Sequence, residues 1–436
     1  MTEEQQKVLD GLLAFAQEHR NGEFSGQALA DKMEPIFQEL GFRKELEPAA
    51  AAKQKILVLR DDAAGDFVLS SAFHRELRRI YPQAHITLFG SDRNHELAQC
   101  CPYIDNLIVN RREYLNHPFW DVFTGLARYV VEVLLPHHFD LGFSGRLGIK
   151  SADVLILYMA GVNRRVGFTQ NRAAGPGRIA VIGWDVLLTA AVPLRARIES
   201  DADRDLFMLE YLLQLPIADR RLEMWLLDAD RREAEQALAP LREERKVRRL
   251  YAVMPGASEL FKEWPVERFA ALLSDIMHQE KDLGLVVLGG PRDREKADVL
   301  AAKFGRRAVS LAGRLPFRVS AAVLSLCERY IGNDTGLMHM AAAQGLPVLT
   351  LFPYPASLNL FPMSCPVRFH PYGVPSVAVL PSTPADEKCR LMHGTGCAER
   401  SGPHCILGVT VEKMREGYAL LNKCIREKRT RTVLLK

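Results

Sequence analysis

The sequence lacks several features that would mark a membrane, secreted or nucleic-acid-binding protein. No stretch of about 18 residues is apolar and uncharged, so no membrane-spanning helix is predicted. The first residues, MTEEQQKVLDGLL, show no secretory signal pattern. The formal net charge of +4 is too small to suggest a nucleic-acid partner. We expect a cytoplasmic protein and leave open a peripheral contact with a membrane.

Cysteine is scarce, with eight residues among 436. Without a secretory signal, these are expected to be reduced thiols rather than a disulfide framework. Three of them, Cys389, Cys397 and Cys405, follow one another with seven residues between each pair. The spacing is not that of a C-x2-C pair, so two interpretations stay open: packed thiols, or a structural zinc or iron site. Further ligands for such a site would come from His393, His404 or Cys365.

A glycine-rich dinucleotide fingerprint, G-x-G-x-x-G, is also missing after the first strand of either half. The first half instead carries Asp61-Asp62-Ala63-Ala64-Gly65-Asp66 at this position. Three carboxylates make the turn a poor phosphate site, but a carboxylate here can serve as a general base.

What the sequence does contain is an alternation of apolar strands and helices. Near-continuous apolar strands separated by helices indicate parallel sheets that are covered on both faces. Strands are predicted over 55–60, 85–89, 106–109, 139–143, 250–254, 285–288, 329–332 and 347–352, and helices over 67–80, 93–100, 121–135, 266–279, 292–304 and 336–344.

The length favours two domains, and we predict the α/β class with two doubly wound, Rossmann-like lobes. The expected parts are a helical extension over 1–52, a lobe over 53–240 and a lobe over 241–436, which includes the cysteine segment and a C-terminal helix. The charge-rich stretch 227–248 is the predicted hinge. The extension is interpreted either as a helical pair covering the edge of a core or as a cap for oligomerisation or acceptor docking.

Polar, glycine-containing turns follow several strands of the second half. The stretch PGASELFKEWPVERFA, residues 255–270, places Ser258 and Lys262 between a strand and a helix. Another turn, GNDTGLMH, opens an alanine-rich helix, which Asp334 or Thr335 can cap. Because the carboxyl ends of parallel strands face one rim, the turns together favour an anion site there. Taken alone, the first turn could equally be a surface turn with a solvated lysine. The second could equally do no more than cap its helix.

These segments resemble glycosyltransferase family 9, the ADP-heptose:lipopolysaccharide heptosyltransferases and their relatives. The resemblance runs in order over about residues 55–420, and Gly-Asn-Asp-Thr-Gly-x-x-His-x-Ala-Ala-Ala is its most specific element. It also rests on ILVLRDDAAGDFVLSSAFHRELRRIYPQAHITLFGS, PGASELFKEWPVERFAALL and VVLGGPRDREKA. The resemblance implies a two-lobed glycosyltransferase B fold. It further implies inverting transfer of a heptose from ADP-heptose, with no cofactor or metal required for catalysis.

Carried over to this chain, the resemblance implies that Asp66 is the general base and that Lys262 stabilises the leaving diphosphate. The C-terminal lobe would bind the nucleotide sugar, and Glu295, or alternatively Asp293, would lie near the nucleoside. The candidate donor-binding residues, from the turns and the resemblance together, are Gly256, Ser258, Lys262, Gly289, Glu295, Asp334, Thr335, Gly336, Leu337 and His339.

The acceptor is less well defined. Arginines would suit an acceptor bearing phosphates or acidic sugars, and surface arginines are the alternative reading. The chain departs from the family pattern at Asp61-Asp62, where small or neutral residues are usual, and this bears on the acceptor. The candidate acceptor-binding residues are Arg60, Ser144, Arg146 and Arg164.

Three functions are weighed. The first is transfer of a heptose to a bacterial surface glycan, with the lipopolysaccharide inner core as the expected acceptor and a protein as the alternative acceptor. Such an enzyme is expected in the cytoplasm, and both a peripheral contact at the inner face of the inner membrane and a homo-oligomer stay open. The second is a sugar-nucleotide epimerase on the same fold. The third is a nucleotide-sugar-binding or scaffold protein without turnover.

Overall fold

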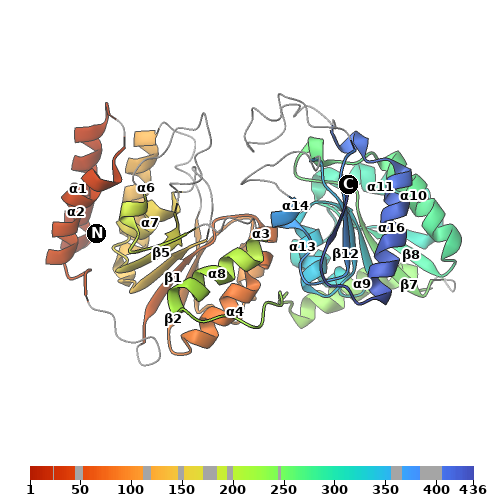
Figure 1. Ribbon diagram of the computed structural model, residues 1–436, viewed down its shortest axis with the longest axis horizontal. Coiled ribbons are helices and arrows are strands. Elements are labelled where there is room, and N and C mark those ends of the chain that lie inside the picture. Colours follow the sequence, from red (N-terminus) through yellow and green to blue (C-terminus); the bar gives the residue numbers. More distant parts are fainter. Residues whose placement is uncertain are drawn as a thin grey trace. The chain divides into compact units, whose positions relative to one another are not determined.

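The computed structural model contains two parallel sheets, each flanked by helices (Figure 1). The structure describes residues 1–22, 24–44, 53–110, 119–145, 152–169, 184–193, 200–243, 247–354, 366–382 and 405–436. The chain forms two compact units. Unit 1 consists of Met1–Asp62, Phe73–Arg197 and Arg204–Ala218, and unit 2 consists of Ala63–Ala72, Ile198–Asp203 and Asp219–Lys436.

The sheet of unit 1 has the strand order β3-β2-β1-β4-β5-β6, and every neighbouring pair is parallel. Since sequential strands run outward from β1 and then resume beside it at β4, the order reverses next to β1, as in a doubly wound sheet. The strands are β1 (Lys55–Leu59), β2 (His85–Ser91), β3 (Asn106–Asn110), β4 (Leu141–Ser144), β5 (Arg164–Phe168) and β6 (Ala190–Val192). The helices are α1 (Glu3–His19), α2 (Gly26–Glu39), α4 (Ser71–Ile80), α5 (His95–Ala98), α6 (Phe119–Val133), α7 (Asp153–Met159) and α8 (Asp201–Leu213).

The two N-terminal helices cover the helices on one face of this sheet (Figure 1). Thr2 and Gln5 form a capping box that starts α1, and the side chain of Gln5 also donates to the backbone oxygen of Val131, 3.0 Å away in α6. The ring of Phe15 packs against Phe123, which is 1% exposed. Helices α1 and α2 thus form a pair that packs on the helix layer of one sheet face, and a role in oligomerisation or acceptor docking stays a prediction.

The sheet of unit 2 has the order β13-β12-β11-β10-β7-β8-β9, again with parallel neighbours throughout. Alternate strand residues such as Tyr251 and Val253 pack against α10 and α16 on one face, while α13 lies on the other face (Figure 1), with α12 packed beside it. The strands are β7 (Arg249–Met254), β8 (Leu283–Val287), β9 (Ala308–Ser310), β10 (Arg329–Asn333), β11 (Val348–Leu351), β12 (Ser376–Val379) and β13 (Val433–Leu435). The helices are α3 (Ala64–Leu69), α9 (Asp228–Glu243), α10 (Val266–Gln279), α11 (Arg294–Ala302), α12 (Phe317–Leu324), α13 (Gly336–Ala343), α14 (Pro366–Phe369) and α16 (Val411–Arg426).

The helix predicted over 67–80 is in fact two helices. At Ser70 the hydroxyl donates to the backbone oxygen of Phe67, 2.7 Å away, and the chain leaves the helical conformation between α3 and α4. The short helix α3 then packs on α13, which explains why Ala63–Ala72 belong to unit 2 although they follow β1 along the chain.

The compact units also differ from the expected parts near residue 240. The predicted first lobe and hinge include α9, but α9 packs on α12 within unit 2. An ion pair holds it there, since Arg318 Nε lies 2.6 Å from Asp230 Oδ2, and both side chains are largely buried. In the part of the chain that the structure describes, no helix is long and apolar enough to cross a membrane.

Candidate active site

The predicted catalytic lysine lies in a buried ion pair at the carboxyl ends of the strands of unit 2. Lys262 ends the short 3-10 helix η3 (Leu260–Lys262), and its Nζ lies 3.0 Å from Oδ2 of Asp334, which follows β10. The lysine side chain is 18% exposed and the aspartate 10%. Burial by itself lowers the pKa of Lys262, but Asp334, Tyr354 and Asp66 outweigh it and raise the pKa above its ordinary value. The lysine therefore stays a cation at neutral pH.

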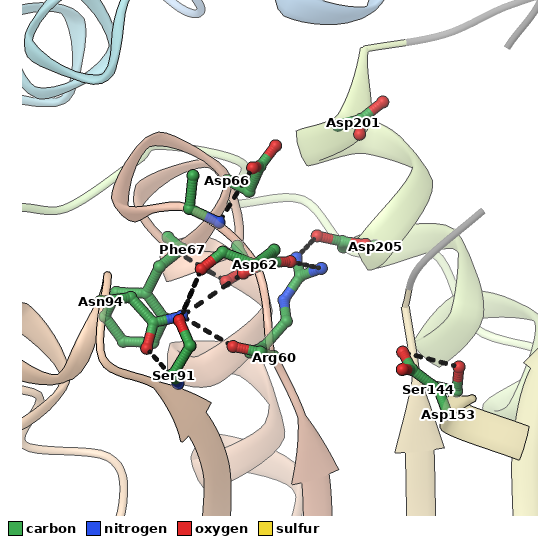
Figure 2. A network of polar contacts seen from close by, with 12 residues as sticks. Arg60, Asp62, Asp66, Phe67, Ser91, Asn94, Ser144, Asp153, Asp201 and Asp205 are labelled. Atoms are coloured by element: carbon green, nitrogen blue, oxygen red, sulfur yellow. Dashed lines mark hydrogen bonds and ion pairs between the residues drawn. The ribbon is translucent and has the colours of Figure 1, made fainter. Parts of the chain in front are cut away.

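The predicted base, Asp66, belongs to the same unit as this ion pair. It lies in the first turn of α3, partly exposed, and its Oδ2 accepts from the backbone N–H of Ala63 at 3.3 Å (Figure 2). The sequence places Asp66 and Lys262 in opposite lobes, whereas the structure groups both in unit 2. The Asp66 carboxylate is close enough to act electrostatically on Lys262 and on His339.

Glycine makes this approach possible. A Cβ added to Gly65 would lie 3.0 Å from Cα of Gly336 and 3.0 Å from Cδ2 of His339. These distances are tighter than ordinary Cβ contacts, so any larger residue at position 65 would push α3 away from the start of α13. The close packing of Gly65 on Gly336 thus fixes α3 against α13, and this sets the position of the Asp66 carboxylate.

The expectation that Asp334 or Thr335 caps α13 is wrong. Thr335 occupies the N-cap position, but its side chain makes no capping hydrogen bond and lies 3.1 Å from the hydroxyl of Tyr330 instead. The carboxylate of Asp334 pairs with Lys262 instead. The N–H groups of the first turn of α13 therefore lack a side-chain cap among the described residues, and such groups favour an anion.

His339 follows one turn into α13 and is 5% exposed. Within the described residues its Nδ1 has no hydrogen-bond partner. Burial lowers its pKa below the ordinary value, although Asp334 and Asp66 oppose the shift. The imidazole is therefore neutral at pH 7, with one ring nitrogen left for a ligand.

The turn after β8 supports the turn after β7. A Cβ on Gly256 would come within 2.1 Å of the buried carboxylate of Asp293, and one on Gly289 within 2.7 Å of Cβ of Asp293. The Asp293 Oδ2 accepts from Gly290 N at 2.9 Å. These glycines are thus required by packing. Of the two candidates for the nucleoside, Asp293 is buried in this contact, while Glu295 is exposed.

Ser258 and Leu337 complete the predicted donor set in the described chain. Ser258 is exposed, and its backbone oxygen accepts from Arg292 at 3.2 Å, which joins the two turns. Leu337 is 4% exposed and packs inside the unit. The structure therefore brings together Asp66, Lys262, Asp334 and His339, with the glycines of the three turns around them.

The predicted acceptor residue Arg60 is instead part of a closed polar network in unit 1 (Figure 2). Its guanidinium pairs with Asp205 and lies 3.3 Å from Oδ2 of Asp62, and the residue is 4% exposed. The Asn94 side chain donates to the backbone oxygens of Arg60 at 2.6 Å and of Asp62 at 3.2 Å. Asp61 likewise accepts from Asn110 at 3.1 Å. Both unusual carboxylates of this turn therefore have partners within unit 1.

The remaining acceptor candidates do not gather at one place. Ser144 ends β4 beside Leu59 and is 2% exposed, with its hydroxyl 3.4 Å from Asp153 Oδ2. Arg164 is exposed but opens β5 beside Leu141, at the opposite ends of the strands. Arg146 lies outside the described residues.

The cysteine cluster falls mostly outside the described residues as well. Cys389, Cys397, His393, His404 and Cys365 all lie there, and Cys405 is buried at the start of a 3-10 helix, Cys405–Gly408. In the ranges that the structure covers, no three His, Cys, Asp or Glu side chains are grouped to hold a metal ion. The structural metal stays a prediction.

Sequence reasoning missed two residues that support the site. Asn333 and Tyr330, both in β10, hydrogen-bond to the turns that carry Lys262 and Thr335. The sequence pointed to Asn333 only through its position in the GNDTG element.

Comparison with known sequences supports the resemblance seen in the sequence. The profile of glycosyltransferase family 9 (heptosyltransferase) matches residues 132–389. Lipopolysaccharide heptosyltransferase 2 of Salmonella typhimurium is 25% identical over 321 residues, covering 68% of this chain and 82% of that protein. Lipooligosaccharide heptosyltransferase 2 of Haemophilus ducreyi is 24% identical over 306 residues, with 67% and 81% covered.

Solved structures share the fold. A glycosyl transferase family 9 protein of Veillonella parvula superposes with a TM-score of 0.63 at 19% identity, over 86% of this chain and 99% of that one. E. coli ADP-heptose LPS heptosyltransferase II gives a TM-score of 0.56 at 18% identity, over 85% and 99%. The predicted two-lobed, Rossmann-like glycosyltransferase B fold with its N-terminal helices is confirmed.

Proposed function

The chain belongs to glycosyltransferase family 9, the heptosyltransferases, and on that premise we propose that it moves a heptose from ADP-heptose to a hydroxyl of a bacterial surface glycan, with inversion at the sugar. It is a glycosyltransferase by family. The observation that carries the finer proposal is the largely buried Lys262–Asp334 pair beside Asp66. It lies at the start of α13, which has no side-chain cap among the described residues.

The base in this proposal is Asp66. Inverting transfer needs a base that takes the acceptor proton as the hydroxyl attacks the anomeric carbon from the side opposite the leaving group. Asp66 and Asp334 are the two carboxylates near Lys262. Asp334 is paired with the lysine, whereas Asp66 is partly exposed, so Asp66 is the carboxylate that we assign as the base. The acceptor oxygen forms the new bond, the anomeric C–O bond to the diphosphate breaks, and the proton passes to Asp66.

The leaving group in this proposal is ADP, whose diphosphate gains negative charge as the bond breaks. Lys262 supplies a fixed cation and the first turn of α13 supplies N–H donors. The neutral His339 adds a ring nitrogen that a hydroxyl or phosphate oxygen of the donor can meet. Gly256 and Gly289 keep the two neighbouring turns packed around Asp293, and we place the nucleotide against the backbone of these turns, with Ser258 at the edge.

The choice of donor rests on relatives. E. coli heptosyltransferase WaaC has been solved with ADP and with ADP-2-deoxy-2-fluoro heptose, and shares the fold at TM-scores of 0.56 and 0.54. We extend that donor to this chain. The reaction is proposed to need no metal, because Lys262 and the helix start offer the positive charge that a metal otherwise supplies.

For the acceptor we propose the lipopolysaccharide inner core, because the curated relatives are named for lipopolysaccharide or lipooligosaccharide. Such an acceptor fits an enzyme working at the inner face of the inner membrane. A protein acceptor is the second candidate, since the departure from the family pattern at Asp61-Asp62 leaves the acceptor less well defined than the donor.

The test combines the purified chain with ADP-heptose and inner-core acceptor in the presence of EDTA. The expected product is a heptosylated acceptor whose new linkage, by NMR, has the anomeric configuration opposite to that of the donor. Retention at the anomeric carbon, or activity that EDTA abolishes and Mg²⁺ restores, would contradict the mechanism. Conversion of ADP-heptose to an epimer without acceptor would favour the epimerase alternative.

A further inference from the structure

We infer that Asn333 is a positioning residue that sets the place of Lys262 by holding both ends of the loop on which the lysine sits. The inference rests on the proposed function in one respect: that function makes Lys262 the cation beside the leaving diphosphate. Asn333 ends β10, is fully buried, and directly precedes Asp334, the partner of Lys262.

The carboxamide of Asn333 binds the loop at its beginning and at its end. Its Nδ2 donates to the backbone oxygens of Pro255, at 2.8 Å, and of Gly256, at 3.2 Å, where the chain leaves β7. Its Oδ1 accepts from the backbone N–H of Trp264 at 3.3 Å, two residues after Lys262. Two carbonyls and one N–H fix which side of the amide carries nitrogen.

Only an amide meets all three partners. A carboxylate of the same shape would face two carbonyl oxygens with acceptors, and an alanine would leave the Pro255 and Gly256 oxygens without this donor in a buried place. The Asn333 carboxamide thus holds the loop against the end of β10, where Asp334 follows.

Other contacts hold the loop to parts of unit 2 outside β10. Trp264 is anchored by its ring, since Nε1 donates to the oxygen of Val409 at 2.7 Å. Glu263 pairs with Lys296 at 2.6 Å. The ring of Phe261 also packs on Tyr354, and the backbone oxygen of Ser258 accepts from Arg292. None of these contacts reaches β10, so we expect the Asn333 carboxamide, which joins the loop to the end of that strand, to set the distance between Lys262 and Asp334.

The experiment compares Asn333→Ala with Asn422→Ala, alone and combined with Lys262→Met. Asn422 is the matched control, because its carboxamide also binds β10, accepting from Arg329 at 2.6 Å at the other end of the strand. Asn333→Ser, which keeps a small donor, replaces Asn333→Ala if the latter unfolds in a thermal melt.

Hydrogen exchange of the peptide spanning 255–264 is the first readout and needs no activity. We expect faster exchange there in Asn333→Ala and unchanged exchange in Asn422→Ala. Unchanged exchange in the Asn333 variant would overturn the inference, whatever the reaction proves to be.

The second readout is a double-mutant cycle on kcat and on ADP affinity. Asn333→Ala should lower kcat about 10- to 100-fold, as expected for a displaced catalytic group, with the acceptor KM little changed. In the Lys262→Met background the same substitution should change kcat less than about twofold. An equal fall in both backgrounds would overturn the inference. If the wild type transfers no sugar, the proposed function fails, and the same cycle on the Kd of ADP together with the exchange data decides the role of Asn333.

Discussion

Two strand-end clusters carry most of the charged side chains discussed above, and they are built in opposite ways. In unit 1, Arg60 lies between Asp62 and Asp205, and Asn94 binds the same turn. In unit 2, Lys262 has one close carboxylate partner, Asp334, with Asp66 partly exposed nearby and the start of α13 left uncapped.

On the proposed function, the difference separates a structural cluster from a reactive one. Arg60 has its charge matched inside the network, so a ligand would have to break buried pairs to use it. The cluster in unit 2 brings together a cation, a neutral histidine and a helix start that has no side-chain cap among the described residues. An acceptor role for Arg60 therefore finds no support in its surroundings, whereas the donor role of Lys262 does.

The largest effect is expected from Asp66→Asn. Loss of the base should lower the transfer rate about 10²- to 10⁴-fold, while the asparagine oxygen can still accept from Ala63 N and keep α3 in place. Steady-state kinetics and ADP calorimetry measure the two quantities. A rate within about threefold of wild type would show that another group takes the proton.

Lys262→Met should come next. Removing the cation should lower kcat about 10²- to 10³-fold and also weaken ADP binding, because Asp334 is left without its partner beside the diphosphate. Lys413→Met is the control, because the Lys413 amine donates to the backbone oxygen of Leu380 and the hydroxyl of Ser382 and belongs to no part of the proposed site. Equal rates for the two variants would remove Lys262 from the mechanism.

Asp205→Asn tests the other cluster. Taking away one partner of a buried arginine should lower the free energy of unfolding by about 3 kcal/mol, with Asp62 remaining as the second partner. The exposed pair of Asp298 and Arg314 is the control, and Asp298→Asn should cost less than about 1 kcal/mol. Urea unfolding gives both values. A large loss of ADP affinity in the Asp205 variant would mean that this cluster does reach the donor site.

The smallest effect is a pH dependence of stability in unit 1. Burial, with a contribution from Arg60, lowers the pKa of His74 to about 3, while the unfolded chain takes up this proton near pH 6.5. Between these values the unfolded state binds the extra proton, so stability falls with falling pH, by about 1.4 kcal/mol per pH unit. His74→Phe should flatten the decline between pH 6.5 and pH 5 by that amount. An unchanged slope in urea unfolding would show that His74 is charged in the folded protein.

Local patterns predicted some elements well. The helix expected over 266–279 is observed as Val266–Gln279, because Trp264-Pro265 ends the preceding loop and the apolar spacing then holds for the whole helix. The closeness of Lys262 and Asp334 could also be predicted, since both follow strands of one parallel sheet and the motifs mark their positions. Asp66 follows β1 of the other sheet, and its place in the same unit as Lys262 was not predicted.

Other features depend on contacts that local patterns do not encode. Five strands were not predicted: β6, β9 and β13, which have three residues each, and β5 and β12, which have five and four. The burial of Arg60 depends on Asp205, which lies 145 residues away in the sequence. The assignment of α3 to unit 2 depends on the Gly65–Gly336 contact, and neither glycine alone predicts its partner.

Coupling of ADP release to acceptor tests the central claim most directly. With saturating ADP-heptose, chromatography should show one ADP released for each heptose transferred, release only when the acceptor is present, and almost none from Asp66→Asn. Release at the same rate without acceptor would make the chain a hydrolase, and bound donor that never releases ADP with any glycan or protein acceptor would make it a binding protein. Either result would contradict the assignment of Asp66 and Lys262 to sugar transfer.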